Sequence, residues 1–331
     1  MATHPLISPL STPQPTTTVE PPDRRFDHPA AIVCGLLFLA ALAIGLLHQV
    51  PGFGVETDFA GGFAPAARDL LHGLPYLYPY HPPGYAALLA ATSLITRDFF
   101  LAGKLLGALS GTLLAWFGYL LLRDLYSSRV AFAATILLAV ATVPYAYIAS
   151  SDLPDAAVIA AGFLILFRPG RFTAGRAAAL GLIAGLAYLI RSSGIIVLIG
   201  AVAVLLLIDP ERRRVGARLR SAGVVIALFL VAIAPVYIYN LATLGHFFAP
   251  TAYAQIGPDL DPTVDRSTLT GTSAVIGSEA VAETILQHPV AAANRYTRNV
   301  LYYYPPRVAQ GLLGFPLVLF AGAGLLVIVA R

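Results

Sequence analysis

Residues 30–50 read AAIVCGLLFLAALAIGLLHQV, an apolar run of 21 residues that contains no Asp, Glu, Lys or Arg. An α-helix rises about 1.5 Å per residue, so a run of this length crosses the ~30 Å hydrocarbon core of a bilayer. A secretory signal would carry its apolar core nearer the start of the chain and would end in a small-residue cleavage site. We therefore interpret residues 30–50 as an uncleaved transmembrane helix.

The composition of the whole chain agrees with this interpretation. Of the 331 residues, 57% are hydrophobic and 11% are charged, and the mean hydropathy is +0.75, whereas soluble domains carry about 25% charged residues. This excludes a soluble enzyme, because too little polar surface remains to face water. The formal charge of +4 is scattered among apolar runs, which argues against a nucleic-acid partner. A single cysteine, Cys34, excludes disulfides and cysteine zinc sites.

Arginine clusters separate the apolar runs and predict the topology. Positively charged short loops stay in the cytoplasm, and two apolar runs lie between each cluster and the next. The clusters are Arg24/Arg25, Arg123/Arg129, Arg168/Arg171/Arg176, Arg212–Arg220 and Arg331. The apolar runs are 30–50, 99–122, 130–148, 153–167, 173–190, 192–208, 221–239 and 308–330.

This pattern predicts an all-α fold, a polytopic integral membrane bundle of about eight transmembrane helices with both termini in the cytoplasm. Residues 1–29 are rich in Pro and Thr and are expected to form a disordered cytoplasmic tail. Residues 30–331 are expected to form one transmembrane domain.

Two segments on the outer side, 51–98 and 240–307, are too long to be ordinary loops. The first contains an expected amphipathic helix from Phe63 to Leu71 and a short apolar helix at 84–95, and the second ends in YYYPP, residues 302–306. Tyr-rich segments beside short apolar helices suit the membrane–water interface. We expect outer-face juxtamembrane helices and a site at the outer membrane surface.

Several short motifs share this outer placement. They are TDF (57–59), AARDLLHG (66–73), YHPPGY (80–85), SDLP (151–154), LIRSSG (189–194) and the stretch from Pro235 to Asn240 followed by Gly245. In this order they resemble the GT-C glycosyltransferases, in particular family 39, the protein-mannosyltransferase and aminoarabinose-transferase group. The pair Asp58-Phe59, where that family often has Asp-Glu, is similar to the related family 87 mannosyltransferases. The resemblance implies a GT-C-like fold and a polyprenyl-phosphate-linked sugar as donor.

Asp58, which follows the first transmembrane helix, is the expected catalytic base. Transfer of a sugar to a hydroxyl needs a base within hydrogen-bond reach of the acceptor proton, and a carboxylate can serve. The resemblance favours this role over the alternative of a solvated loop carboxylate. Glu56 is the second candidate for the same role.

Three residues are expected to bind the donor phosphate: Arg191, Lys104 and His81. Arg191 lies between two apolar runs, where an ionisable residue is costly and therefore a functional candidate. The alternative is an arginine that snorkels to the interface. Lys104, near the start of its apolar helix, has the same two interpretations. His81 either contacts the phosphate or caps the short segment that Pro82 begins.

Asp152, at the tip of the second outer turn, is the candidate metal ligand. Two outer carboxylates can share a divalent cation, Mg²⁺ or Mn²⁺, that bridges a phosphate; the alternative for Asp152 is an N-cap of the helix beginning near Leu153. Asp155 is interpreted as a first-turn residue favoured by the helix macrodipole. Since the first, third and fifth helices end at the outer face, Asp58, Asp152 and Arg191 are expected to converge.

These features predict a glycosyltransferase of the inner, plasma membrane that moves the sugar to a glycan, lipid or protein acceptor at the outer face. Tyr76, Tyr80 and Tyr85 are expected to line the entry for sugar or lipid, since tyrosine offers an apolar face with a polar tip. Membrane lipids are the other expected partners. Two alternatives stay open: a non-catalytic membrane assembly partner, and a lipid or solute transporter, which would place ionisable residues near the bilayer midplane within broken helices.

Overall fold

The computed structural model describes most of the chain, and its described residues form helices, turns and loops without a β-strand. The described residues are 24–47, 58–74, 76, 81–208, 214–244 and 285–303. Residues 1–23 of the predicted tail, Glu56, Tyr80 and the eighth predicted span at 308–330 therefore lie outside them. The last residues of the predicted tail are described, and the first helix already begins at Asp27. Within the described residues, the prediction of an all-α fold is confirmed.

Among the described residues, four helices are long and apolar enough to cross a membrane. They are α1 (Asp27–Leu47), α4 (Phe99–Leu125), α5 (Ser128–Ala146) and α9 (Val215–Leu244). Shorter helices occupy the remaining predicted spans: α6 (Asp152–Phe167), α7 (Ala174–Ile190) and α8 (Ile195–Ala203), which continues as the π-helical η3 (Val204–Ile208). The chain is a multi-pass membrane protein. Helix α9 begins at Val215, before the start expected at residue 221, because the basic segment that precedes residue 221 is already helical.

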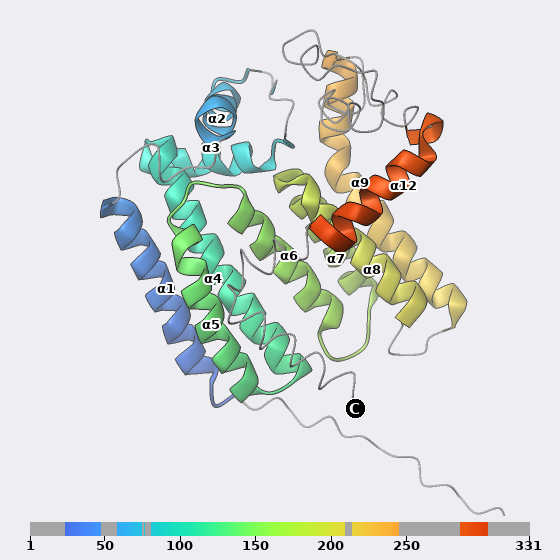
Figure 1. Ribbon diagram of the computed structural model, residues 1–331, viewed down its shortest axis with the longest axis horizontal. Helices are drawn as coiled ribbons and strands as arrows, with labels where there is room; N and C mark the ends of the chain where they lie inside the picture. Colours follow the sequence, from blue (N-terminus) through green and yellow to red (C-terminus); the bar gives the residue numbers. More distant parts are fainter. Residues whose placement is uncertain are drawn as a thin grey trace, which may run out of the picture.

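The helices pack as two groups joined by α6 (Figure 1). On one side, α4 packs against α1, α5 and α6, and on the other side α7 packs against α6, α8 and α9. Small residues at the contacts let the backbones approach closely, as in other membrane bundles. At Gly185, for example, an added Cβ would clash with the Cβ of Ala232 in α9.

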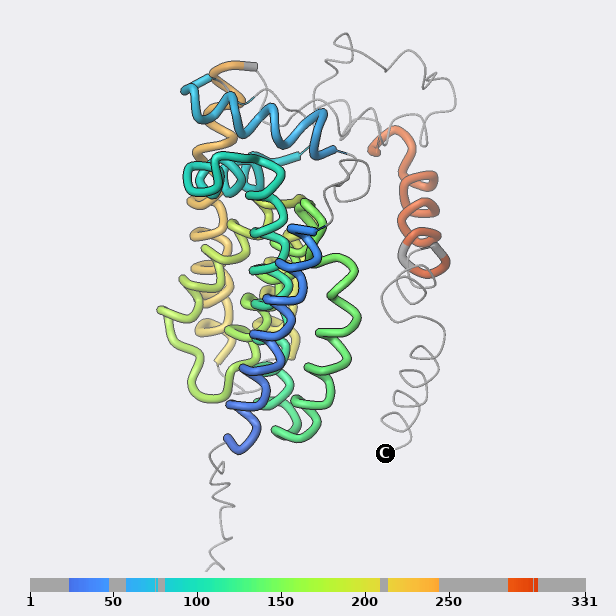
Figure 2. The backbone as a smooth tube through the Cα atoms, turned by 90° about the vertical axis from the view of Figure 1, so that its left-hand side faces the viewer, coloured from blue at the N-terminus to red at the C-terminus, as the bar shows by residue number. Residues whose placement is uncertain are grey.

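Short helices cover one end of this bundle, here called the α2–α3 end. The π-helical η1 (Phe59–Phe63) runs into α2 (Ala64–Leu71), and α3 (Gly84–Thr96) follows. Figure 2 shows α2 and α3 lying across the bundle rather than along it. The amphipathic helix expected at Phe63–Leu71 and the short apolar helix expected at 84–95 are thereby confirmed. The helix α12 (Pro289–Arg298), followed by η5 (Asn299–Tyr303), stands apart from the bundle, and none of its residues is buried (Figure 2).

At the opposite end, arginine side chains tie helix ends together. Nη1 of Arg123 lies 3.0 and 3.1 Å from the two carboxylate oxygens of Asp27, in the first turn of α1. The Tyr119 hydroxyl donates to the same carboxylate over 2.7 Å. Arg176 donates to the carbonyls of Ile165 and Arg168, each over 2.7 Å, at the C-terminal end of α6. Arg176 thus satisfies terminal carbonyls that a helix alone leaves without partners, whereas Arg123 ties α4 to α1 through a carboxylate.

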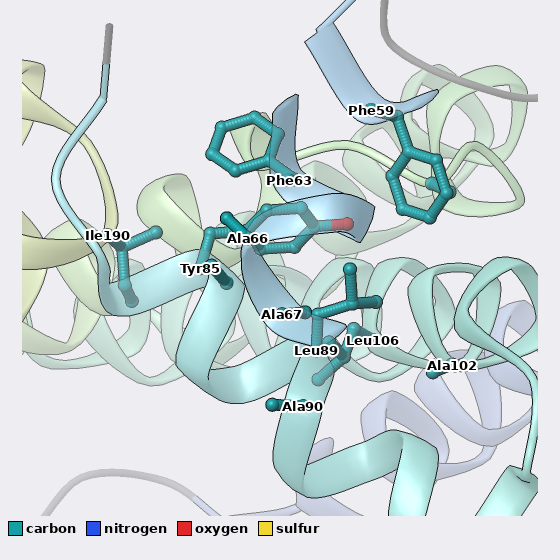
Figure 3. Packing of buried hydrophobic residues seen from close by; sticks show 12 residues of the cluster. Phe59, Phe63, Ala66, Ala67, Tyr85, Leu89, Ala90, Ala102, Leu106 and Ile190 are labelled. Atoms are coloured by element: carbon teal, nitrogen blue, oxygen red, sulfur yellow. The ribbon is translucent and has the colours of Figure 1, made fainter. Parts of the chain in front are cut away.

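A buried aromatic cluster joins the short helices to the bundle. The Phe63 and Tyr85 rings meet edge to face with centroids 4.8 Å apart, and Ile190 of α7 belongs to the same cluster (Figure 3). Gly84 stands against the end of α7, because a Cβ added to it would lie 2.5 Å from the carbonyl oxygen of Leu189. Only glycine permits this approach, which seats α3 on the last turn of α7.

This contact predicts that Gly84→Ala destabilises the protein. The obstructing atoms belong to the backbone and cannot rotate away, so we expect an overpacking cost of about 1–3 kcal/mol and a lower melting temperature in detergent. Gly216→Ala is the matched control, because Gly216 also lies near a helix start and an added Cβ there meets nothing within 4 Å. Equal melting temperatures for the two variants would contradict the close contact.

Candidate functional site

The first polar pair at the α2–α3 end joins Asp58 to His81. Asp58 directly precedes η1, and its Oδ2 lies 2.9 Å from Nε2 of His81. The Phe63 ring stacks on the imidazole with centroids 5.1 Å apart. The Asp58 side chain is 44% exposed, while that of His81 is 18% exposed. A largely covered imidazole therefore orients a carboxylate that water and substrates can reach.

The structure excludes one of the two interpretations of His81. Helix α3 begins at Gly84 with Pro83 as its N-cap, and no side chain caps it. The expectation that His81 caps this segment is therefore wrong, because the imidazole is directed to Asp58 instead. A contact between a histidine and a carboxylate 23 residues away has no local signal in the sequence.

Two of the three predicted tyrosines fall within the described residues, and both support the loop that carries His81. The Tyr76 hydroxyl donates to the carbonyl of His81 over 2.8 Å, which fixes the backbone before α3. Tyr85 is wholly buried against Phe63, so its ring supports the site from below (Figure 3). Tyr80, the third, lies outside the described residues.

The second polar pair joins Asp152 to Arg191. Nη1 of Arg191 lies 2.9 Å from Oδ1 of Asp152 and donates to the Ser151 hydroxyl over 2.6 Å. The Ser150 hydroxyl donates to Oδ2 of Asp152 over 3.0 Å and accepts from the Asp152 backbone N–H. Arg191 itself has extended backbone where the chain leaves α7. The guanidinium is thus held by the start of α6, across 40 residues of sequence.

The alternative role of Asp152 as an N-cap is wrong. Helix α6 begins at Asp152 itself, Ser151 is its N-cap, and the Ser151 side chain makes no capping hydrogen bond. The Asp152 side chain is 65% exposed and that of Arg191 is 30% exposed. This pair therefore lies at the surface of the α2–α3 end, where a ligand can reach it.

A third contact, which the sequence analysis missed, lies beside this pair. The Ser193 hydroxyl donates to Oδ2 of Asp155 over 2.6 Å. Asp155 is a first-turn residue of α6, as expected, but its side chain is buried. One signal was present in the sequence: Asp152 and Asp155 are three residues apart and so share a helix face. Their common partner, the Arg191–Gly194 turn, depends on the tertiary structure.

The docking of α3 on α7 brings the first two pairs to the same place. Gly84 touches the backbone of Leu189 and Ile190, and Arg191 follows directly. His81 is three residues before Gly84, and three residues of extended chain span at most about 11 Å. The Asp58–His81 and Asp152–Arg191 pairs are therefore neighbours at the α2–α3 end.

Lys104 is placed differently from both interpretations that the sequence suggested. Its side chain is buried. Its ammonium donates to the Gly45 carbonyl over 2.6 Å and lies 4.0 Å from the centroid of the Phe100 ring. Gly45 is in the last turn of α1, where carbonyls lack helical partners and a cation is favourable. Lys104 therefore anchors the C-terminal end of α1, with a cation–π contact to Phe100, and does not snorkel.

The described residues do not by themselves form a metal site. No group of three or more His, Cys, Asp or Glu side chains comes together among them. Both oxygens of Asp152 are engaged, one by Arg191 and one by Ser150. A divalent cation prefers six or more oxygen ligands, so one at Asp152 would need ligands besides this carboxylate, from substrate phosphate or water.

Comparison with known proteins bears on the segment that carries most of these residues. Residues 80–239, just under half of the chain, match the family model described as dolichyl-phosphate-mannose-protein mannosyltransferase. No curated protein and no solved structure matches the chain. The matched segment includes His81, Asp152 and Arg191 and begins after Asp58. Residues 80–239 are thus similar to this family of membrane glycosyltransferases, and the resemblance of the chain to GT-C glycosyltransferases of the family 39 type is confirmed.

Proposed function

We propose that the protein transfers a sugar from a polyprenyl-phosphate donor to an acceptor hydroxyl at the outer face of the plasma membrane, with Asp58 as general base. The observation that carries the proposal is the neighbourhood of an exposed, oriented carboxylate and an arginine at one end of a membrane bundle. The family match supports a membrane glycosyltransferase that uses a polyprenyl-phosphate sugar.

In the proposed reaction Asp58 accepts the proton of the acceptor hydroxyl as its oxygen attacks the anomeric carbon. The bond between that carbon and the phosphate oxygen breaks, with inversion, and its electron pair leaves with the polyprenyl phosphate. His81 holds Oδ2 of Asp58, which fixes the direction of the carboxylate before the acceptor arrives. Arg191 stabilises the negative charge that develops on the leaving phosphate, since a guanidinium can offer two parallel hydrogen bonds.

The Asp152–Arg191 pair imposes a condition on donor binding. A phosphate that binds Arg191 meets the Asp152 carboxylate already there, and two negative groups at one guanidinium repel each other. In one case the Asp152 side chain, which is 65% exposed, rotates away from Arg191 toward the solvent. In the other case a divalent cation lies between the carboxylate and the phosphate. We propose the first case, in which removal of Mg²⁺ and Mn²⁺ with a chelator leaves donor affinity unchanged.

The position of the polar pairs favours surface chemistry over the two alternatives. A transporter places its ionisable residues near the bilayer midplane, whereas both pairs lie at helix ends, at the end of the bundle that α2 and α3 cover. A non-catalytic assembly partner needs neither an exposed carboxylate held by a histidine nor an arginine beside it.

The role of Asp58 is tested by Asp58→Asn. The amide keeps the size of the side chain but removes the base, so turnover should fall by roughly 10²–10⁴ with expression unchanged. The assay measures loss of label from a panel of labelled polyprenyl-phosphate sugars incubated with the purified protein. Asp69→Asn, the same substitution in the neighbouring helix α2, should leave turnover unchanged. Wild-type turnover in Asp58→Asn would move the role to Glu56 or end the enzyme hypothesis.

The role of Arg191 is tested by binding. Arg191→Ala should weaken binding of polyprenyl phosphate by about 1.5–3 kcal/mol, the range for a hydrogen bond to a charged group, and Arg191→Lys should weaken it less. Arg129→Ala, an exposed arginine outside the site, is the control. Lys104→Met should lower the melting temperature and leave affinity unchanged, because its ammonium is engaged by Gly45 and Phe100. Unaltered affinity in Arg191→Ala would remove Arg191 from the site.

The outer-face assignment is tested by thiol labelling in intact cells. The native Cys34 is buried, so the background should be low. Leu74→Cys, exposed at the α2–α3 end, should react with an impermeant thiol reagent, whereas Arg214→Cys at the opposite end should react only after permeabilisation. The reverse pattern would place the site on the cytoplasmic side.

A further inference from the structure

We propose that Asp155 is a positioning residue for the donor site, because it holds, through Ser193, the turn that presents Arg191. The inference rests on the proposed function, in which Arg191 binds the donor phosphate. It assigns a role to a buried carboxylate that the proposed reaction does not use.

Two parallel links join the first turn of α6 to the segment that follows α7. The first runs from Arg191 to Ser151 and Asp152, and the second from Ser193 to Asp155. Arg191 and Ser193 are two residues apart, and their partners at the start of α6 lie within about one helical turn. Two links at this spacing fix the rotation of the segment as well as its distance from α6, which one link would not do.

The backbone between these links is seated on α7. Residues Ser192–Gly194 form a short 3₁₀ turn, η2, that packs against both α6 and α7. The Gly194 N–H donates to the carbonyl of Arg191 over 2.9 Å. A Cβ added to Gly194 would clash with the Ala187 carbonyl carbon, so the turn rests directly on the last turn of α7. A shift of this turn therefore moves the Cα from which the Arg191 side chain extends.

The burial of Asp155 indicates that the carboxylate does more than fill space. The side chain is 4% exposed, and within the part of the chain that the structure describes its Oδ1 has no hydrogen-bond partner. Leaving a buried polar atom without a partner is costly, more so for a charged group. Asp155 lies one helical turn after Asp152, the partner of Arg191, and its own partner Ser193 is two residues after Arg191. An anion at this point offsets that cost by attracting Arg191 toward α6.

Preorganisation is the physical benefit for donor binding. A free arginine side chain has several rotatable bonds, and each bond that a ligand must immobilise reduces its affinity. A turn that is fixed at Ser193 removes backbone freedom at Arg191 before the phosphate arrives. The expected consequence is tighter donor binding with little change in the chemical step.

The same turn contains its own control. Ser192 is also exposed, has the same side chain and precedes Ser193 directly, yet in the described part of the chain its hydroxyl makes no hydrogen bond. Ser192→Ala and Ser193→Ala therefore remove the same atom from adjacent positions, and only the second removes the link to Asp155. Asp155→Asn keeps an oxygen that can accept from Ser193 and removes the charge.

The experiment measures three quantities on the full-length protein in detergent: affinity for sugar-free polyprenyl phosphate, hydrogen exchange of the backbone amides at 191–195, and melting temperature. Ser193→Ala should weaken lipid-phosphate binding roughly three- to tenfold and speed exchange in the turn. Its melting temperature should fall, because the buried Asp155 carboxylate loses the hydroxyl that donates to it, so affinity and exchange are measured well below the melting temperature of every variant. In turnover assays KM for the donor should rise by the same factor while kcat stays unchanged. Ser192→Ala should match the wild type, and Asp155→Asn should keep the slow exchange with an intermediate affinity.

Several outcomes would overturn the inference. Wild-type affinity for polyprenyl phosphate in Ser193→Ala would remove the positioning role, and so would an equal loss of affinity in Ser192→Ala. If the affinity of Ser193→Ala falls only at temperatures where the variant begins to unfold, Asp155 is a purely structural residue. If the wild type binds polyprenyl phosphate and Arg191→Ala does not, these outcomes reject the positioning role of Asp155 but leave the proposed function standing. If the wild type itself fails to bind polyprenyl phosphate, the proposed function is rejected, and the positioning role with it.

Discussion

The close approach of Gly84 to the backbone of Leu189 and Ile190 is the contact on which the candidate site depends. It seats α3 on the end of α7 and so places the loop that carries His81 beside the turn that carries Arg191. Without it, the Asp58–His81 pair and the Asp152–Arg191 pair would belong to separate parts of the α2–α3 end. The buried cluster that contains Phe63, Tyr85 and Ile190 adjoins this contact and joins the short helices to α7 (Figure 3).

The bilayer imposes the other constraint, because an unpaired charge in hydrocarbon is costly. Four cations in the described part of the chain satisfy this constraint in three ways. Arg123 and Arg176 bind helix ends at the end opposite α2 and α3, Lys104 binds the C-terminal end of α1, and Arg191 pairs with Asp152. Of these, Arg191 pairs with a carboxylate that is exposed enough to exchange for another anion. The same physical cost thus accounts for the structural arginines and singles out Arg191 as the proposed phosphate ligand.

The family match and the geometry support different parts of the proposal. The match covers residues 80–239 and bears on the kind of donor. It does not include Asp58, whose place in the site depends on its contact with His81, a residue within the matched segment. Asp58 and Arg191, the proposed base and the proposed phosphate ligand, are therefore brought together by the structure rather than by the match.

The sequence by itself determined the class of fold, the positions of the helices and the ends at which charge gathers. These features are local, since the length of an apolar run, a cluster of arginines or a short amphipathic segment acts where it stands in the chain. Asp58, Asp152 and Arg191 were identified from such signals and from motif order. The tertiary structure decided which side chains meet: His81 with Asp58, Lys104 with Gly45, and Asp155 with Ser193. Their partners are 23, 59 and 38 residues away in the chain, and contacts at such separations depend on how helices pack, which no local pattern encodes.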